Sequence, residues 1–373
     1  MAMRSLVSAV VCFSLGAIAV LLALEAVLRV LPATSGFNPS PMTEATPLHN
    51  FEPHRAYRYS QTWAMLNPHA SMTNNYGHIA PVDYRAGSRP MIVVGDSFIE
   101  SLMNDFGDTV QGILGARLGA GQPVYGLGAS GLSVSDYVVL ARQARDEFSP
   151  TAAVFLISDG DISESLLYRP GGYVLQQRGS EYNLGYVPRS PNASMAWVRA
   201  RIGDLALYDY LRGNLKFSPE NLIAGFGWGE SGRAAPKRTP LAIATELRVA
   251  DWFLTGLASA TGVAPECTVV LIDADRYAMY DAKLASVPKD SPEVRRFLID
   301  RGRTLGFHVL DLEPAFRAAY AQTRLKLDHW PIDRHWNRRG HAVAADEVMK
   351  ALFANPVSSQ CKPGTGTRAN PGR

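Results

Sequence analysis

From residue 90 onward, short apolar runs alternate with longer amphipathic stretches, and this alternation restricts the fold more than any other feature. Five runs have the length and β-branched content of buried parallel strands. They are residues 91–95, 123–127, 152–157, 268–272 and 308–312. Helical patterns cover residues 106–119, 133–147, 241–258, 292–305, 313–323 and 339–353. We therefore predict an α/β domain with a doubly wound parallel five-stranded sheet of flavodoxin-like order.

The N-terminal segment predicts a membrane anchor. The run from Leu6 to Leu24 carries no charge, and at ~1.5 Å per residue it is about 28 Å long, close to the thickness of a bilayer's hydrocarbon core. A cleaved signal peptide has a shorter apolar region followed by a small-x-small site, whereas here a helical pattern continues to Pro32. We predict an uncleaved signal-anchor over residues 1–32. A cleaved signal peptide and a buried helix of a soluble core are the alternatives.

The positive charge of Arg4 favours a cytoplasmic N-terminus. We therefore predict a single-pass inner-membrane protein whose chain after the span faces the periplasm. We expect a linker and N-terminal extension over residues 33–88 and the α/β domain over 89–355. Within it, residues 162–240 are rich in Gly, Tyr and Arg, and we interpret them as an insertion that covers the site. We expect residues 356–373 to be a C-terminal tail.

Composition excludes several classes of protein. With 47% hydrophobic and 19% charged residues, the chain is neither disordered nor fibrous. Its net charge is only +3 and the basic residues form no cluster, so no nucleic-acid partner is expected. Asp159 and Asp161 lack partner ligands at usable spacing, and no Cys/His run has the spacing of zinc ligands. The sequence therefore predicts no metal and no cofactor.

The sequence Gly95-Asp96-Ser97-Phe98 follows the first predicted strand of the sheet. Ligands of open α/β sheets bind at this carboxyl edge. A serine on the turn into the next helix can be exposed there, with backbone N–H groups near a developing oxyanion. We predict that Ser97 is a nucleophile and that Asp96 fixes the turn by accepting backbone N–H groups. Asp-Ser is also a common turn and N-cap, so this motif alone is weak.

A second motif, Asp333-Arg334-His335-Trp336-Asn337, precedes the last predicted helix. A carboxylate two residues before a histidine can hold one ring nitrogen and leave the other for a serine. We predict that His335 is the base, that Asp333 orients it, and that Asn337 is the N-cap of the last helix. His329 is a rival base without the following Asn. His341 is expected to be a packing residue at the helix start.

Together these motifs resemble the SGNH/GDSL hydrolase superfamily. Ser97 in Gly-Asp-Ser matches its first block, and Gly131 in Gly-Ala-Ser-Gly resembles its second, which implies that the Gly131 N–H donates to an oxyanion. Asp333 and His335, followed by Trp-Asn, resemble its last block as found in periplasmic polysaccharide O-acetyltransferases and esterases. The resemblance covers residues 90–160 and 265–353.

The third block of that superfamily supplies an asparagine side chain to the oxyanion hole, and this chain departs from it. The sequence after the third strand reads Ser158-Asp159-Gly160-Asp161, with Gly160 at the asparagine position. A lost oxyanion donor costs about 2.7–4 kcal/mol. One possibility is that Ser158 or a backbone N–H replaces the missing donor, and we place the residues Ser97, Gly131 and Gly160 in the oxyanion hole. The other is that the site is slow or inactive. An ionised Asp159 has no proton to donate.

The sequence thus predicts a serine esterase or O-acyltransferase that forms an acyl-enzyme on Ser97. The resemblance implies an acetyl group, an extracytoplasmic carbohydrate as substrate or acceptor, and a partnership with a membrane-bound acyltransferase. Hydrolase and transferase are not separated by the residues. The alternative is a catalytically degenerate protein of the same fold that binds carbohydrate, because the asparagine is missing.

Two of the three cysteines lie outside the predicted membrane span. Cys267 directly precedes the fourth strand, at the sheet edge opposite the catalytic one. The last helix starts at the catalytic edge and runs antiparallel to the strands, so it returns the chain toward Cys267. The residues between that helix and Cys361 can span the remaining gap at ~3.3 Å each. We predict a Cys267–Cys361 disulfide, since thiols outside the cytoplasm tend to oxidise.

Overall fold

The computed structural model describes residues 2–37, 42–179, 181–188, 203–217, 239–353 and Cys361. The chain divides into two compact units. The smaller unit comprises residues 1–38, 56–71 and 191–231, and the larger one residues 39–55, 72–190 and 232–373. The insertion predicted over 162–240 and the tail predicted over 356–373 lie partly outside the described residues.

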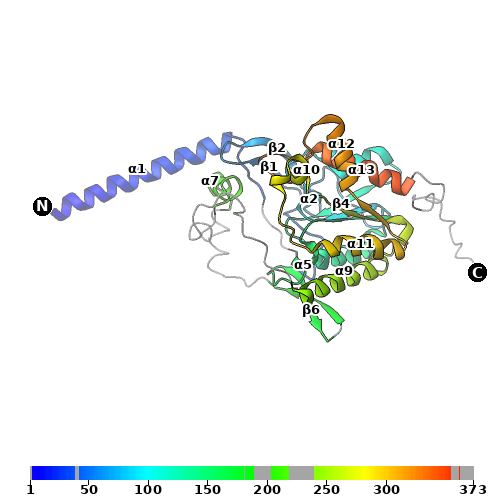
Figure 1. Cartoon of the computed structure of the whole chain (residues 1–373). Coiled ribbons are helices and arrows are strands. Elements are labelled where there is room, and N and C mark those ends of the chain that lie inside the picture. The colour runs from blue at the N-terminus through cyan, green and yellow to red at the C-terminus, as the bar shows by residue number, and fades with distance from the viewer. Residues whose placement is uncertain are drawn as a thin grey trace, which may run out of the picture. The chain divides into compact units, whose positions relative to one another are not determined.

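A five-stranded sheet forms the centre of the larger unit (Figure 1). Its strands are β3 (Met91–Gly95), β4 (Val124–Gly128), β5 (Ala152–Ile157), β8 (Thr268–Ile272) and β9 (His308–Asp311). Their order is β4-β3-β5-β8-β9, and every neighbouring pair is parallel. In chain order this is 2-1-3-4-5, the flavodoxin-like arrangement. The predicted α/β fold with a five-stranded parallel sheet is confirmed.

Alternate residues of each strand enter separate cores on the two faces of the sheet, as period-2 geometry requires. Ile92 and Val94 join one buried cluster, and Met91 and Val93 join the other. Helices α4 (Val134–Phe148), α9 (Pro240–Thr261) and α11 (Pro292–Thr304) cover the first face. Helices α3 (Val110–Leu118), α12 (Glu313–Thr323) and α13 (Arg338–Phe353) cover the second.

Shorter elements connect these layers. They are α2 (Ser97–Glu100), η1 (Phe106–Asp108), α5 (Asp161–Glu164), β6 (Gly172–Arg178), β7 (Glu181–Val187), η3 (Pro265–Cys267), α10 (Arg276–Tyr280) and η4 (Ala282–Leu284). Strands β6 and β7 pair as an antiparallel hairpin. The helix predicted over 106–119 is divided into η1 and α3, because the Thr109 side chain accepts the N–H of Gly112 and starts a new helix there.

The smaller unit contains α1 (Ala2–Val30), a hairpin of β1 (Ala56–Gln61) and β2 (Leu66–Met72), α7 (Ala206–Asp209) and the π-helical turn η2 (Tyr210–Asn214). The hairpin lies in the segment that we expected to be an irregular extension. Within α1, residues Leu6–Val30 form a helix that is long and apolar enough to cross a membrane, and a signal sequence meets the same description.

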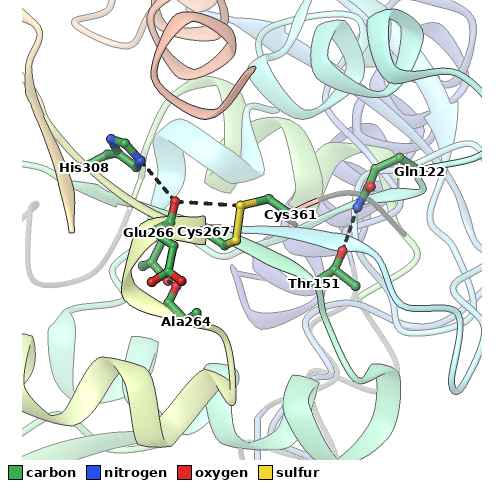
Figure 2. Close-up of a disulfide and its surroundings, with 8 residues drawn as sticks. Gln122, Thr151, Ala264, Glu266, Cys267, His308 and Cys361 are labelled. Atoms are coloured by element: carbon green, nitrogen blue, oxygen red, sulfur yellow. Dashed lines mark hydrogen bonds between the residues drawn. A yellow bond between two sulfur atoms is a disulfide. The ribbon is translucent and has the colours of Figure 1, made fainter. Parts of the chain in front are cut away.

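Cys267 and Cys361 are joined in a disulfide, with their Cα atoms 5.4 Å apart (Figure 2). Both residues are buried. The carbonyl of Glu266 accepts a hydrogen bond from Nε2 of His308 at 3.0 Å beside it. The disulfide attaches Cys361, which lies beyond α13, to the start of β8, at the sheet edge opposite the carboxyl ends of the strands.

Replacing Cys361 by Ser should lower the free energy of unfolding by about 2–4 kcal/mol, because the bond closes a long loop and restricts the unfolded chain. Chemical denaturation of the oxidised protein measures this, with Cys12→Ser as the matched control because Cys12 is an exposed free cysteine. Thiol titration of oxidised, denatured protein should find one thiol. Three titratable thiols would contradict the prediction.

Candidate active site

Ser97, His335 and Asp333 meet at the carboxyl edge of the sheet. Nε2 of His335 lies 2.7 Å from Oγ of Ser97, and Nδ1 lies 2.5 Å from Oδ1 of Asp333. A ring nitrogen facing a carboxylate carries the proton, so Nε2 is the nitrogen that can accept the proton of the serine. This geometry is that of a nucleophile, a base and an orienting carboxylate.

The turn that presents Ser97 depends on the two residues before it. Gly95 ends β3, and a Cβ at this position would lie 2.5 Å from Cγ1 of Ile99. The chain therefore turns tightly enough for α2 to begin directly at Ser97. Asp96 is the N-cap of α2, because its Oδ1 accepts the N–H of Phe98 at 3.0 Å. This agrees with the turn-fixing role that we predicted for Asp96.

Asn337 joins the loop that carries Asp333 and His335 to α13. Its Oδ1 accepts the N–H of Arg339 at 2.9 Å. Its Nδ2 donates to the carbonyls of Lys326 (3.0 Å) and Asp328 (2.7 Å). The predicted N-cap thus also fixes the strand-like segment that precedes the loop.

Two residues that the sequence analysis missed hold the other side of the loop. Asp273 follows β8, and its Oδ1 accepts the indole N–H of Trp336 at 2.9 Å. Arg276 is 4% exposed and donates from Nη2 to the carbonyl of Arg334 at 2.6 Å. The carbonyl and the indole that they hold belong to the residues on either side of His335. The position of Asp273 directly after a predicted strand was the available signal.

The other two histidines near the site are parts of the framework. Backbone N–H of Val110 donates to Nδ1 of His341 at 3.1 Å, so Nε2 of His341 carries the proton toward Oγ of Ser101 at 3.0 Å. Burial lowers the pKa of His341 to about 3. His329 lies with Nε2 3.2 Å from Oδ1 of Asn104. Asn104 in turn donates to the carbonyl of Trp336 at 2.8 Å, so this network also positions the loop.

The electrostatics of His335 suit a base. Burial by itself lowers its pKa, but the hydrogen bond and charge of Asp333, together with the charge of Asp96, outweigh burial and raise the pKa above its ordinary value. A more basic imidazole takes the serine proton more readily. It is also protonated, and therefore inactive as a base, up to a higher pH.

Ser158 lies between two buried carboxyl groups. Its Oγ is 3.0 Å from Oδ2 of Asp96 and 2.9 Å from Oδ1 of Asp161. Burial and the charge of Asp96 raise the pKa of Asp161 well above its usual range. The other oxygen of Asp161 accepts hydrogen bonds from Tyr137 and from the Ser158 N–H. The Ser158 hydroxyl has one proton, and both groups within its reach are these buried carboxyl oxygens of Asp96 and Asp161.

These contacts remove Ser158 from the candidates for the missing oxyanion donor, because its one proton is directed at a carboxyl oxygen of Asp96 or Asp161. The N–H of Gly160 is also engaged. It donates to Oδ2 of Asp290 at 3.0 Å, instead of pointing into an oxyanion hole as we predicted. Asp159 accepts the N–H groups of Lys289 and Asp290, so it fastens the same loop.

Two predicted oxyanion donors remain. Among the residues that the structure describes, the N–H groups of Ser97 and Gly131 donate to no acceptor. The loop that carries Gly131 is anchored by Glu100, a buried residue of α2 whose carboxylate accepts from Oγ of Ser130 and, at 2.9 Å, from Nδ2 of Asn50. Gly131 itself has φ +78°, a conformation that favours glycine.

No protein-family model and no curated protein matches the sequence. Among solved structures, similar folds include LAE5, an alpha/beta hydrolase from the metagenome of Lake Arreo in Spain, at 16% identity and a TM-score of 0.37, over 72% of this chain and 96% of that one. A member of the lipolytic G-D-S-L family from Veillonella parvula has 13% identity and a TM-score of 0.36, over 71% of this chain and 98% of that one. An acetyl xylan esterase from Butyrivibrio proteoclasticus has 10% identity and a TM-score of 0.34, over 77% and 66%. At these values we draw no functional conclusion from the likeness.

Because the base must be neutral, kcat/KM for an ester should rise with pH along a limb whose midpoint lies above ~6.5, the ordinary histidine value. Asp333→Asn should move this midpoint to lower pH and reduce kcat/KM by about 10⁴-fold. A pH–rate profile of both proteins measures the two effects. An unchanged midpoint in the variant would show that Asp333 does not set the basicity of His335.

Gly160→Asn should destabilise the protein and should not increase kcat. Gly160 has φ +109°, and a Cβ there would lie 2.8 Å from Cδ of Lys289. We expect a loss of about 1–3 kcal/mol in the free energy of unfolding. Lys289→Ala is the matched control and should recover part of the loss in the double variant. An increase in kcat of about tenfold would instead mean that an asparagine here reaches the oxyanion.

Proposed function

We propose that this protein is a serine esterase or O-acyltransferase that acts on acetyl esters of a carbohydrate outside the cytoplasm. The observation that carries the proposal is the continuous contact from Oγ of Ser97 through the ring of His335 to Asp333. The acetyl and carbohydrate specificity follows from the motif resemblance described above. In a transferase, a membrane-bound acyltransferase is the partner that supplies the acyl group.

The reaction begins when Oγ of Ser97 attacks the acyl carbonyl and Nε2 of His335 takes its proton. Asp333 stabilises the imidazolium that forms. The N–H groups of Ser97 and Gly131 stabilise the oxyanion of the tetrahedral intermediate. His335 then protonates the leaving alkoxide, and an acyl-enzyme remains. Water or a sugar hydroxyl, deprotonated by Nε2 of His335, then attacks the acyl carbonyl, the ester bond to Oγ of Ser97 breaks, and His335 returns the proton to Oγ.

An extracytoplasmic location is supported by two features of the chain. Helix α1 is long and apolar enough to cross a membrane. The Cys267–Cys361 disulfide is of the kind that persists in oxidising compartments such as the periplasm. We propose a single-pass inner-membrane protein whose catalytic unit faces the periplasm.

A second candidate function is carbohydrate binding without turnover. It is favoured by the loss of the third donor, because Gly160 has no side chain and both its N–H and the Ser158 hydroxyl are engaged elsewhere. The alignment of Ser97 with His335 favours the enzyme, since a binding protein has no need of a base at hydrogen-bonding distance from a serine.

Ser97→Ala should abolish labelling by a fluorophosphonate probe and reduce kcat on p-nitrophenyl acetate by up to about 10⁶-fold. Ser259→Ala, at an exposed serine of α9, is the matched control and should label fully. If the wild type is labelled and Ser97→Ala is labelled equally, the nucleophile is a residue other than Ser97. A folded wild type without labelling would favour the binding protein.

A further inference from the structure

The last turns of α1 belong to the core of the smaller unit. The carboxylate of Glu25 accepts the N–H groups of Ala206 (3.0 Å) and Leu207 (2.9 Å), the first two residues of α7. Leu28 is only 6% exposed and packs in one buried cluster with Ala33 and Ala206. Helix α7 lies at the C-terminal end of α1 (Figure 1). Without α1 this unit would lose the carboxylate that caps α7 and the largest buried side chain of this cluster.

The chain just after α1 is fixed as firmly. Asn214, 3% exposed, accepts the N–H of Thr34 at 2.8 Å. Its Nδ2 donates to Oγ of Ser60 (2.9 Å) and to the carbonyl of Thr62 (3.1 Å). Oγ of Ser60 donates to the carbonyl of Pro32 at 2.6 Å. One buried amide thus joins the end of the anchor, the β1–β2 hairpin and η2.

The free carbonyls at the end of α1 are also capped from the hairpin. Arg58 of β1 donates from its guanidinium to the carbonyls of Arg29 (3.1 Å) and Leu31 (3.1 Å). A cation at a helix C-terminus satisfies its last carbonyls and its dipole. The helix therefore ends inside a folded structure and not in a linker.

The first charged residue after the apolar run sets the depth at which the end of α1 lies in the bilayer. The uncharged run from Leu6 to Leu24 is about as long as the hydrocarbon core is thick. Glu25 is the first charged residue after it, so it lies at the boundary of that core. The groups that pack against Glu25 and Leu28 must then lie in the headgroup layer.

The hairpin turn presents apolar side chains at this depth. Trp63 is 65% exposed and Leu66 is 45% exposed. Met65, between them, packs against the cluster that contains Leu28. Tyr210 of η2 holds the turn by donating from its hydroxyl to the carbonyl of Trp63 at 2.9 Å. Exposed tryptophan in a rigid turn is unfavourable in water but suited to the membrane interface.

We propose that α1 is retained in the mature protein and that the smaller unit is a juxtamembrane collar, formed by residues 25–37, 56–71 and 203–217, whose turn around Trp63 sits among lipid headgroups. This inference rests on α1 crossing a membrane and is independent of the esterase proposal. The collar fixes the anchor to folded structure instead of leaving it on a loose tether.

The first test is the intact mass of full-length protein purified from membranes with a C-terminal tag. The mass should include residues 6–30. A mature chain that begins within or after this helix would overturn the proposal, because Glu25 and Leu28 would be separated from the unit that they complete.

The second test uses nanodiscs of phosphatidylcholine with bromine atoms near the carbonyl end of the acyl chains, which quench nearby tryptophans. Trp63→Phe should lose most of the quenching seen in the wild type. Trp252→Phe, on α9 of the larger unit, is the matched control and should lose none. Equal quenching of the wild type and Trp63→Phe would overturn the lipid contact, and a change of oligomeric state in Trp63→Phe would assign the patch to a second copy.

Discussion

Parallel pairing places the carboxyl ends of all five strands at one edge, and every feature of the site depends on this constraint. Ser97 follows β3, Ser158 follows β5 and Asp273 follows β8. None of these residues is close to another in sequence. The sheet brings them together before any side chain contributes, and the loop before α13 only has to return to the same edge.

The return of that loop is stabilised by groups that are themselves costly to bury. Arg276 contacts Asp273 at 2.5 Å and lies 3.6 Å from Asp328, whose side chain is fully buried. Burial raises the pKa of Asp328 to about 6. Breaking such a pair leaves an uncompensated charge and costs more than the pair contributes. The positions of Arg334 and Trp336, and hence of His335 between them, depend on keeping these charges together.

Sequence patterns could predict the sheet because buried parallel strands are continuous apolar runs, which need no partner to be recognised. Ser97, Asp333 and His335 were accessible for a related reason, since each stands in a short motif with a fixed spacing. Asp273 and Arg276 were not. The acceptor of the Trp336 indole is 63 residues away, and apart from its place after a strand nothing local to Asp273 distinguishes it from a solvated loop carboxylate.

The same limit explains two other differences. Strand β2 has no buried residue, and its two half-buried positions hold the polar residues Asn67 and His69, so its sequence lacks the apolar alternation that reveals a half-buried strand. Gly160 stands where the superfamily has an asparagine, but Asp290, 130 residues later, takes its N–H. A donor's availability is a property of its distant neighbours, so no local pattern can establish it.

The contact between Ser97 and His335 joins residues 238 positions apart, which has a consequence for the order of events in synthesis. The turn at Ser97 is complete early, when β3 and α2 have emerged. His335, the proposed base, arrives only with the loop before α13, after the other four strands of the sheet have been made. An unassisted serine hydroxyl is a weak nucleophile. In the proposed mechanism, a nascent chain that lacks the loop before α13 therefore has no base for Ser97, and its serine stays unreactive.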